Sequence, residues 1–371
     1  MLTPPLFGML LFTLGGFVGA VFPICFKKVS RWSHETYWLV FVFHGLFLVP
    51  LIYGLVTVPS FFSVLAQTPP PVLCRCIGFG AIWGCGSLCF GLTLRYLGVG
   101  LAVAMVNGIC AAVGTLLPPL VKGHGSEFFR DTSSMTTLAS VFVMLLGIAV
   151  VGWAAAWKDR ELTEEEKKKT IPDYHFSRGL IVALIAGIAS ASMNFGLQAG
   201  DEIAVIATSM GTSDAWKGIP VMFLTMFGGS VTSAAWCLWQ IRKNKSYTDY
   251  FDRKKPLWRN WLWAGIFPGL LWAIQPVSLK MGEPMMGNNA YVGFAIVMGM
   301  AFLFGTLIGI FAGEWRGTGK KTYRLLMLGL SILVLSAIFS GLAGYYKTNE
   351  DVSFDNTSAR LLPKKLVFTN F

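Results

Sequence analysis

Long apolar runs, separated by short polar connections, follow one another along almost the whole chain. A helix that crosses a membrane needs about 20 mostly apolar residues, and the runs have about this length. The pattern therefore predicts an all-α integral membrane protein with about ten transmembrane helices. The predicted spans are residues 5–25, 37–58, 72–94, 98–120, 135–156, 179–199, 216–240, 258–280, 289–312 and 325–346.

The connection between the sixth and seventh spans has two interpretations. It contains the apolar stretch IAVIATSM between residues 200 and 215. A stretch of this kind can extend the sixth helix, or it can form a re-entrant segment at the membrane surface. The sequence leaves both open.

The composition excludes a soluble protein of this length. Of the 371 residues, 54% are hydrophobic and 13% are charged, against about 25% charged residues in an average soluble domain. The net charge is +11, but the basic residues stand between apolar runs, as the positive-inside rule requires of a membrane protein. We therefore expect membrane lipid around this chain, and no nucleic acid.

Basic residues concentrate in every second connection. Most of the 30 Lys and Arg residues follow the first, third, fifth, seventh and ninth predicted spans. Positively charged connections stay on the cytoplasmic side of a membrane. The bias therefore predicts that these odd-numbered connections are cytoplasmic and that both termini lie outside.

The charged run ELTEEEKKKT divides the chain into two halves of five predicted spans. Residues 1–157 would form the first five-helix repeat, 158–178 a charged cytoplasmic linker, 179–346 the second repeat and 347–371 a polar C-terminal tail. The segment that begins at Gly80 aligns weakly with the one that begins at Gly265, and Gly84 then matches Gly269. Because five is odd, the two repeats would enter the membrane in opposite directions, which is typical of secondary transporters.

Polar side chains within predicted spans are candidates for a binding site, because they are costly in lipid unless they are paired or face water. The amides and aromatic rings at mid-span suit a sugar: amides both donate and accept hydrogen bonds, and rings cover C–H faces. The alternatives are hydrogen bonds between helices for the amides and packing for the rings. The predicted substrate-binding residues are Gln275, Trp272, Trp83, Asn194, Gln198 and Asn107.

His44 is the central titratable side chain of the predicted spans, so we expect it to carry the proton if transport is proton-coupled. The alternative is a neutral histidine that is hydrogen-bonded within the bundle. Three carboxylates near span ends, Asp214, Glu283 and Glu314, are second candidates.

Signals for other classes of membrane protein are missing from the sequence. Zinc-protease, serine-hydrolase and phosphate-binding-loop motifs do not occur, so an embedded enzyme and ATP-driven transport are unsupported. The seven cysteines lie in or beside apolar runs and lack metal-site spacing. We therefore expect no catalytic residue, no metal and no cofactor.

The sequence also resembles a known family. The segments FKKVSRWSHETYW and GAIWGCGSLCFGLTLRYLGVGLAVAMVNGICAAVGTLLPPLVKG, with GLLWAIQ and GTLIGIFAGEW in the second half, are similar to the L-rhamnose–proton symporter family of the drug/metabolite transporter superfamily. The resemblance implies a ten-helix 5 + 5 inverted repeat. It also implies import of L-rhamnose by proton symport across a bacterial inner (plasma) membrane.

The chain departs from the family pattern at three places. Cys89 and Phe90 stand where the family has Asn and Tyr, the stretch VMGMAF lacks the family's histidine, and GLQAGDE lacks a lysine. The departures keep alternatives open: another sugar or metabolite, sodium instead of a proton, uncoupled transport, or export. The oligomeric state is open as well.

Overall fold

The computed structural model describes residues 4–121, 132–163, 165–166, 171, 173–252, 254–286, 293–336 and 338–339. This part of the chain is helical and contains no strand, so the prediction of an all-helical membrane protein is confirmed for it. Its candidate membrane spans, seven by length and composition, are Leu6–Lys28, His34–Thr57, Pro70–Leu97, Leu138–Glu161, Phe176–Ser209, Ile219–Asn244 and Leu257–Met286.

Three further helices lie near predicted spans. Two shorter apolar helices cover Val99–Gly114 and Ile296–Phe311, and a third covers residues 320–336. The predicted tail 347–371, the end of the tenth predicted span and part of the predicted linker lie outside the described residues.

Several spans are interrupted helices. The first joins α1 (Pro4–Val21) to the 3-10 helix η1 (Phe22–Lys28). In the second, the π-helix η2 (Val42–Leu48) lies between α2 (His34–Phe41) and α3 (Val49–Thr57). The eighth repeats this order with α13 (Leu257–Trp261), the π-helix η5 (Leu262–Ile266) and α14 (Phe267–Gly282). Each π-helix ends just before a proline, Pro50 or Pro268, which has no N–H for the regular ladder.

The other helices are α4 (Phe61–Gln67), α5 (Pro70–Leu97), α6 (Val99–Val121), α7 (Thr132–Glu161), α9 (Phe176–Ser190), α10 (Ser192–Ala199), α11 (Asp201–Ser209), α12 (Ile219–Asn244), the 3-10 helix η4 (Ser246–Tyr250) and α15 (Gly293–Phe311). The uncertain stretch after residue 200 extends the sixth predicted span as α11, with breaks at Ala191 and Gly200.

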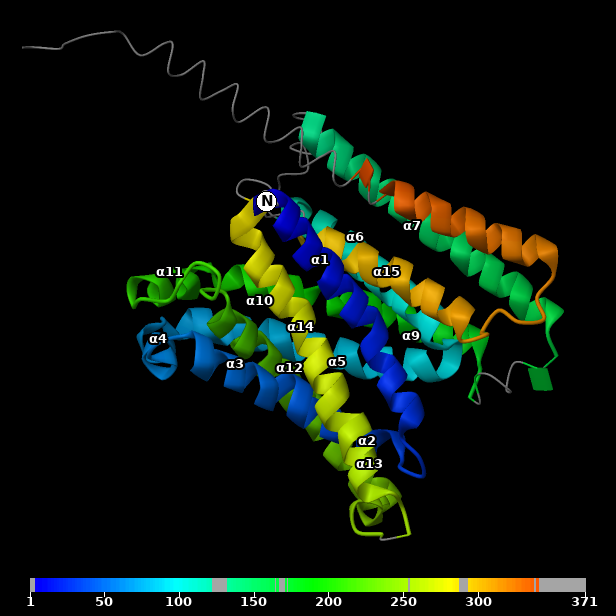
Figure 1. Cartoon of the computed structure of the whole chain (residues 1–371), viewed down its shortest axis with the longest axis horizontal. Helices are drawn as coiled ribbons and strands as arrows, with labels where there is room; N and C mark the ends of the chain where they lie inside the picture. The colour runs from blue at the N-terminus through cyan, green and yellow to red at the C-terminus, as the bar shows by residue number, and fades with distance from the viewer. Residues whose placement is uncertain are drawn as a thin grey trace, which may run out of the picture.

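The helices pack as a closed ring with one pair outside it (Figure 1). Helix α14 packs against α1, α1 against α15, α15 against α6, and α6 against α9. The ring continues from α9 to α5 and α12, and η2 closes it between α12 and α14. Helix α7 and the helix at 320–336 lie side by side outside the ring, where the Ser336 hydroxyl donates to the Ser140 carbonyl.

Glycines allow two pairs of ring helices to approach closely. A Cβ atom on Gly84 of α5 would lie 2.6 Å from the carbonyl oxygen of Gly229 on α12. On the other pair, a Cβ on Gly269 of α14 would lie 3.0 Å from the backbone nitrogen of Gly45 in η2. Small residues at such crossings are typical of membrane helices, because lipid gives no hydrophobic drive for association.

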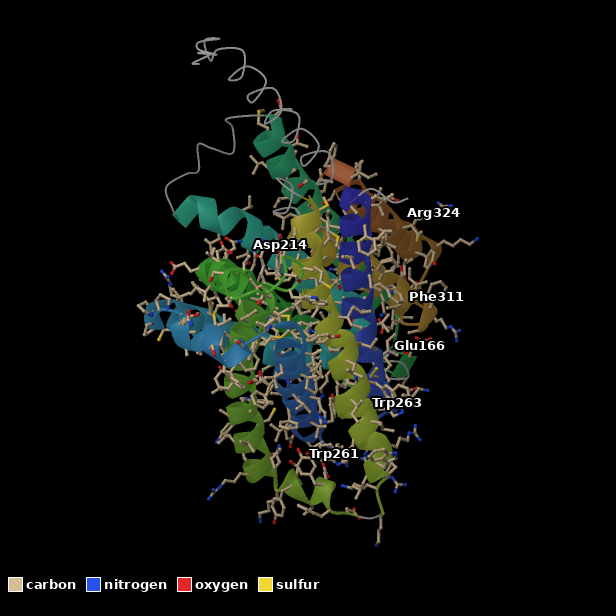
Figure 2. The ribbon with its side chains drawn as sticks, turned by 60° about the vertical axis from the view of Figure 1, so that its left-hand side comes forward. Glu166, Asp214, Trp261, Trp263, Phe311 and Arg324 are labelled. Carbon is tan, nitrogen blue, oxygen red and sulfur yellow. The ribbon has the colours of Figure 1, made fainter. Side chains whose placement is uncertain are left out.

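Apolar side chains also cover the outside of the bundle. Phe142, Ile181 and Phe311 are 70%, 62% and 83% exposed, and Phe311 points away from the ring in Figure 2. A soluble protein rarely exposes such residues in quantity. The exposed surface is therefore suited to contact with lipid.

The odd-numbered connections meet at one end of the bundle, here called the basic end. The Ser30 N–H donates to the Asn260 side chain at 3.1 Å, which joins the first connection to α13, directly after the seventh connection. The Val99 N–H donates to Glu314 at 3.0 Å, and the Arg95 side chain to Asp173 at 2.7 Å. These bonds place the basic residues found in the sequence together at one end.

Candidate functional site

The ring of helices encloses one cavity that collects most of the predicted sugar-binding residues. Its space not filled by protein atoms, including the open mouth, is about 680 Å³. The cavity is lined by Gly19, Phe22, Trp38, Phe41, Leu46, Trp83, Ser87, Phe90, Val106, Asn107, Cys110, Ser190, Met193, Trp272, Gln275, Phe294 and Met298. Apolar walls with a few polar groups are typical of small-molecule sites.

Two tryptophans from opposite halves of the chain meet in this cavity. Trp83 comes from α5 and Trp272 from α14, and their rings stack with centroids 5.4 Å apart at an interplanar angle of 27°. Each is 7% exposed. Flat aromatic faces of this kind can pack against the C–H bonds of a small ligand.

Two amides line the same cavity without a hydrogen-bond partner. Gln275 lies over Gly19 of α1, where a Cβ atom would come within 2.4 Å of the Gln275 Nε2. Asn107 lines the cavity from α6. Neither side chain forms a hydrogen bond to another residue in the described part of the chain. Both side chains are half-buried, and since amides away from bulk water are normally hydrogen-bonded, both are free to bind a ligand.

Several groups that line the cavity carry no signal in the sequence that predicts them. Ser87 and Ser190 add hydroxyls, and Cys110 adds a thiol. Trp38 is 1% exposed, and its indole N–H has no hydrogen-bond partner among the described residues. Its spacing to Phe41 places both rings on one face of α2. A spacing of three is too common in an aromatic-rich chain to have identified them.

Asn194 and Gln198 do not line the cavity with the other candidates. The Asn194 amide lies 3.4 Å from the Gly114 carbonyl, to which it donates a weak hydrogen bond. Gln198 is exposed. Both belong to the short helix α10, where Met193 is the residue that reaches the cavity.

His44 also lies outside the cavity. It sits in η2, where its Nδ1 is 2.8 Å from the Val40 carbonyl oxygen, and it packs against Gly265 of η5. The centroid of its ring lies 6.0 Å from that of Trp261. In Figure 2, Trp261 and the second candidate Asp214 lie in different parts of the bundle. The contact with Val40 fits the alternative of a histidine bonded within the bundle, while its role in proton transfer stays a prediction.

The three carboxylates named as second candidates have cationic partners. Asp214 pairs with Lys217 at 3.0 Å, Glu283 with Lys280 at 2.8 Å and Glu314 with Lys27 at 3.5 Å. Glu314 also accepts the Val99 N–H. Each of these carboxylates is therefore part of an ion pair outside the cavity.

An aromatic cluster separates the cavity from the basic end. Phe22 and Phe41 stack with centroids 5.5 Å apart and line the cavity. Phe26, next to Lys27, packs against Trp38 and Tyr37, with centroids 5.4 Å apart in both pairs. The cavity is thus closed by rings on the side of the basic connections.

Comparisons with known proteins match the chain to a family of transporters. The family model "L-rhamnose-proton symport protein (RhaT)" matches residues 3–345. A protein of Pectobacterium atrosepticum named L-rhamnose-proton symporter is 29% identical over 92% of this chain and 99% of its own length. Proteins of the same name from Mannheimia succiniciproducens and Yersinia pestis are 29% and 28% identical, over 88% and 90% of this chain and 95% and 97% of their own. No solved structure matches the chain.

Proposed function

The chain belongs to the L-rhamnose-proton symport protein family, and from this membership we propose that it imports a small sugar, first of all L-rhamnose, together with a proton. A transporter of this family is a multi-pass membrane protein and not an enzyme. The observation that carries the substrate class is the cavity, where two stacked tryptophans lie beside two unpartnered amides.

This cavity suits the two kinds of surface on a deoxyhexose. The ring faces of Trp83 and Trp272 suit the C–H bonds and the methyl group. Gln275 and Asn107 offer donors and acceptors to the hydroxyls, because an amide does both. We propose these four residues as sugar contacts; Asn194 and Gln198 lie elsewhere in this conformation and would contact sugar only after the helices move.

We further propose ten spans in a 5 + 5 inverted repeat, as in the drug/metabolite transporter superfamily. The neighbours in the ring support this proposal. In such a repeat each helix corresponds to the one five spans away: α1 to α9, η2 to α12, α5 to α14 and α6 to α15. The packed pair α1–α14 then corresponds to α9–α5. In the same way α1–α15 corresponds to α9–α6, and α5–α12 to α14–η2. All of these pairs are in contact.

The close glycine contacts follow the same correspondence. Gly84 and Gly269, which match in the alignment of the halves, each meet a glycine of the neighbouring helix, Gly229 and Gly45. Two superimposable crossings are expected if both halves descend from one unit and pack by the same rules. The agreement therefore supports an inverted repeat more strongly than the short sequence match does.

The membrane and the orientation complete the proposal. The basic end gathers the positive connections, so the positive-inside rule favours a cytoplasmic location for it. We propose that the protein lies in a bacterial inner membrane with this end inside, and that sugar and proton enter from the other end.

Transport by the purified protein in lipid vesicles tests this function. Uptake of radiolabelled L-rhamnose is measured with and without an imposed pH gradient, and a pH-sensitive dye inside the vesicles follows the proton. We expect sugar uptake that rises with the gradient and acidifies the lumen. Absence of rhamnose uptake under both conditions would exclude the substrate, and uptake that ignores the pH gradient but follows a sodium gradient would exclude the proton.

A further inference from the structure

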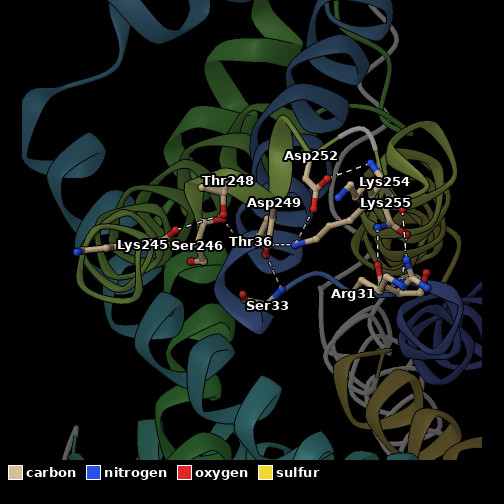
Figure 3. A network of polar contacts seen from close by, with 12 residues as sticks. Arg31, Ser33, Thr36, Lys245, Ser246, Thr248, Asp249, Asp252, Lys254 and Lys255 are labelled. Carbon is tan, nitrogen blue, oxygen red and sulfur yellow. Dashed lines mark hydrogen bonds and ion pairs between the residues drawn. The ribbon is translucent and has the colours of Figure 1, made fainter.

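The first turn of α2 docks against the connection between α12 and α13 at the basic end. The Ser33 N–H donates to Asp249 at 2.7 Å (Figure 3). The Tyr250 hydroxyl also donates to the Thr36 carbonyl at 3.0 Å. The contact joins the first half of the chain to the second. This contact lies at the basic end, the end at which the aromatic cluster closes the cavity. The contact must therefore change if the cavity opens to this end.

Three carboxylates are buried at the basic end, and two of them face a cation. Glu35, Asp249 and Glu314 are 7%, 4% and 4% exposed. Lys255 lies 2.5 Å from Asp249, and Lys27 lies 3.5 Å from Glu314. In the part of the chain that the structure describes, no Lys or Arg pairs with Glu35.

Neutral groups of the second half hold Glu35. Its Oε1 accepts hydrogen bonds from the Asn244 amide at 2.9 Å and from the Ser246 hydroxyl at 2.8 Å. Both of these bonds are to Oε1, and no other residue in the described part of the chain donates a hydrogen bond to the carboxylate. The titratable side chains around it are His34 and Tyr37 on its own helix, Cys237 on α12 and Tyr250 on η4.

Burial takes the Glu35 carboxylate away from water, and in the described part of the chain only the two neutral donors bond to it. Binding a proton removes the charge. A proton on Oε2 would leave both hydrogen bonds to Oε1 in place. The site can therefore be occupied by a proton while the contact between the halves stays closed.

We propose that Glu35 is the residue that binds the transported proton, an inference that rests on the proposed proton symport. While the turn is docked, a hydronium ion that enters with the sugar gives one proton to the Oε2 of the carboxylate; an O–H bond forms at Oε2, one O–H bond of the hydronium breaks, and a water molecule is left. When α2 separates from the α12–α13 connection, water reaches the carboxylate, and the proton passes to that water. Sugar and proton then leave through the same opening.

The place of Glu35 explains how one movement could serve both substrates. Trp38 lies one helical turn from Glu35 on α2 and lines the sugar cavity. Opening at the basic end must move this turn, so the same displacement uncovers the sugar and hydrates the carboxylate. His44 has no such link, because it packs on α14 with its Nδ1 against Val40.

The test compares Glu35→Gln with the wild type in vesicles. The amide has nearly the same size and keeps an oxygen for Asn244 and Ser246, but it cannot be ionised. We expect exchange of labelled for unlabelled sugar without a gradient to persist, while accumulation driven by pH and sugar-dependent proton entry are lost. For one proton per sugar, a gradient of one pH unit supports up to about tenfold accumulation in the wild type.

Asp249→Asn is the matched control, because it alters a buried carboxylate of the same contact that has its own cation. It should lower exchange and accumulation together and leave the proton-to-sugar ratio unchanged. Accumulation that survives in Glu35→Gln but is lost in His44→Ala would overturn the assignment in favour of His44. A wild type that transports no sugar with protons overturns the proposed function itself, whereas coupled transport by Glu35→Gln overturns only the role of Glu35.

Asn244→Ala provides a second measurement if Glu35→Gln does not fold. It removes a donor that stabilises the charged carboxylate, so the proton should bind more tightly. We expect the pH at which coupled uptake is half-maximal to shift upward, and Ser246→Ala should shift it in the same direction. A midpoint that neither variant moves would contradict the proposal.

Discussion

At the scale of single residues, Trp272 gives the most direct test of the cavity. Its ring stacks on Trp83 and forms part of the wall. Loss of a sugar-packing face should cost about 1.5–3 kcal/mol, or roughly 10- to 150-fold in affinity. We expect Trp272→Ala to weaken L-rhamnose binding by that amount, measured by isothermal titration. Trp239→Ala on the exposed side of α12 should leave the affinity unchanged, and equal losses in the two variants would refute the site.

Gln275 tests the polar half of the same cavity. Its amide has no protein partner in the described structure, so Gln275→Leu should remove ligand hydrogen bonds without leaving a protein group unpaired. A net loss of about 0.5–1.5 kcal/mol per bond corresponds to an affinity weaker by roughly two- to twelvefold. The measurement is competition binding with L-rhamnose and with analogues that each lack one hydroxyl. Unchanged affinity for all of them would mean that Gln275 only packs on Gly19.

The residue types alone predicted some of the side chains that line this cavity, whereas the orientation of each helix decides which candidates face it. Gln275, Trp272, Trp83 and Asn107 line it, because polar or aromatic groups at mid-span on ring helices point inward or toward a neighbour. Spacing alone placed Asn194 and Gln198 on one face, but it could not say which way that face turns. The breaks at Ala191 and Gly200 make α10 a separate piece, so its orientation follows from tertiary packing.

At the scale of helices, the crossing of α5 and α12 should tolerate no added side chain at Gly84. A Cβ there would meet the Gly229 backbone at 2.6 Å, and backbone cannot move aside cheaply. We expect Gly84→Ala to destabilise the protein by about 1–3 kcal/mol, as overpacking does. Gly78 lies on the same helix with no atom within 4 Å of its Cβ direction. Gly78→Ala should therefore be neutral or stabilising, and thermal unfolding in detergent compares the two.

The docking of α2 on η4 should depend on pH through Asp249. Burial would raise the pKa of its carboxyl, but hydrogen bonds from Lys255 and from Ser33 outweigh burial and hold the pKa below its ordinary value. The unfolded chain has a pKa of about 3.9 at this group. The carboxylate therefore stabilises the fold fully above that value, and this contribution is lost as the pH falls through the lower folded-state pKa.

Asp249→Asn makes this dependence measurable. Removing a charged hydrogen-bond acceptor should cost about 1–3 kcal/mol near neutral pH. The difference in unfolding free energy between wild type and variant should shrink as the pH falls below about 4. The measurement is thermal unfolding of both proteins at several pH values, and a difference that stays constant down to low pH would contradict the ion pair with Lys255.

Span boundaries were easier to predict than the shape of each helix. The length of the apolar run predicted the third span within a few residues of the ends of α5. Pro70 and Gly98 mark these ends in the sequence. The two π-helices could not be predicted, because Pro50 and Pro268 also allow a plain kink. Gly45 of η2 meets Gly269 of α14, and this contact depends on residues far apart in the sequence.

At the scale of the whole molecule, the proposed repeat has a signal in the sequence, whereas the polar contacts between the halves have none. The match of Gly84 with Gly269 is short, yet each of these glycines meets a glycine of the neighbouring helix. The buried contacts of Glu35 with Asn244 and Ser246 had no comparable signal. They join residues from opposite halves, and polar residues near span ends usually face water.

The closed basic end makes one prediction for the complete transport cycle. If the cavity is to release sugar at this end, the first connection must separate from α13. Two hydrogen bonds between Ser30 and Asn260, at 3.1 and 2.8 Å, now join them. Cysteines at these two positions, in a chain without its native cysteines, can be linked by a short thiol-specific reagent. We expect the link to stop sugar uptake while sugar binding from the opposite end persists. Cleaving a reducible linker should restore transport, whereas either single cysteine should have no effect. Transport at the full rate by the linked protein would mean that this end does not open, and that the sugar leaves by another path.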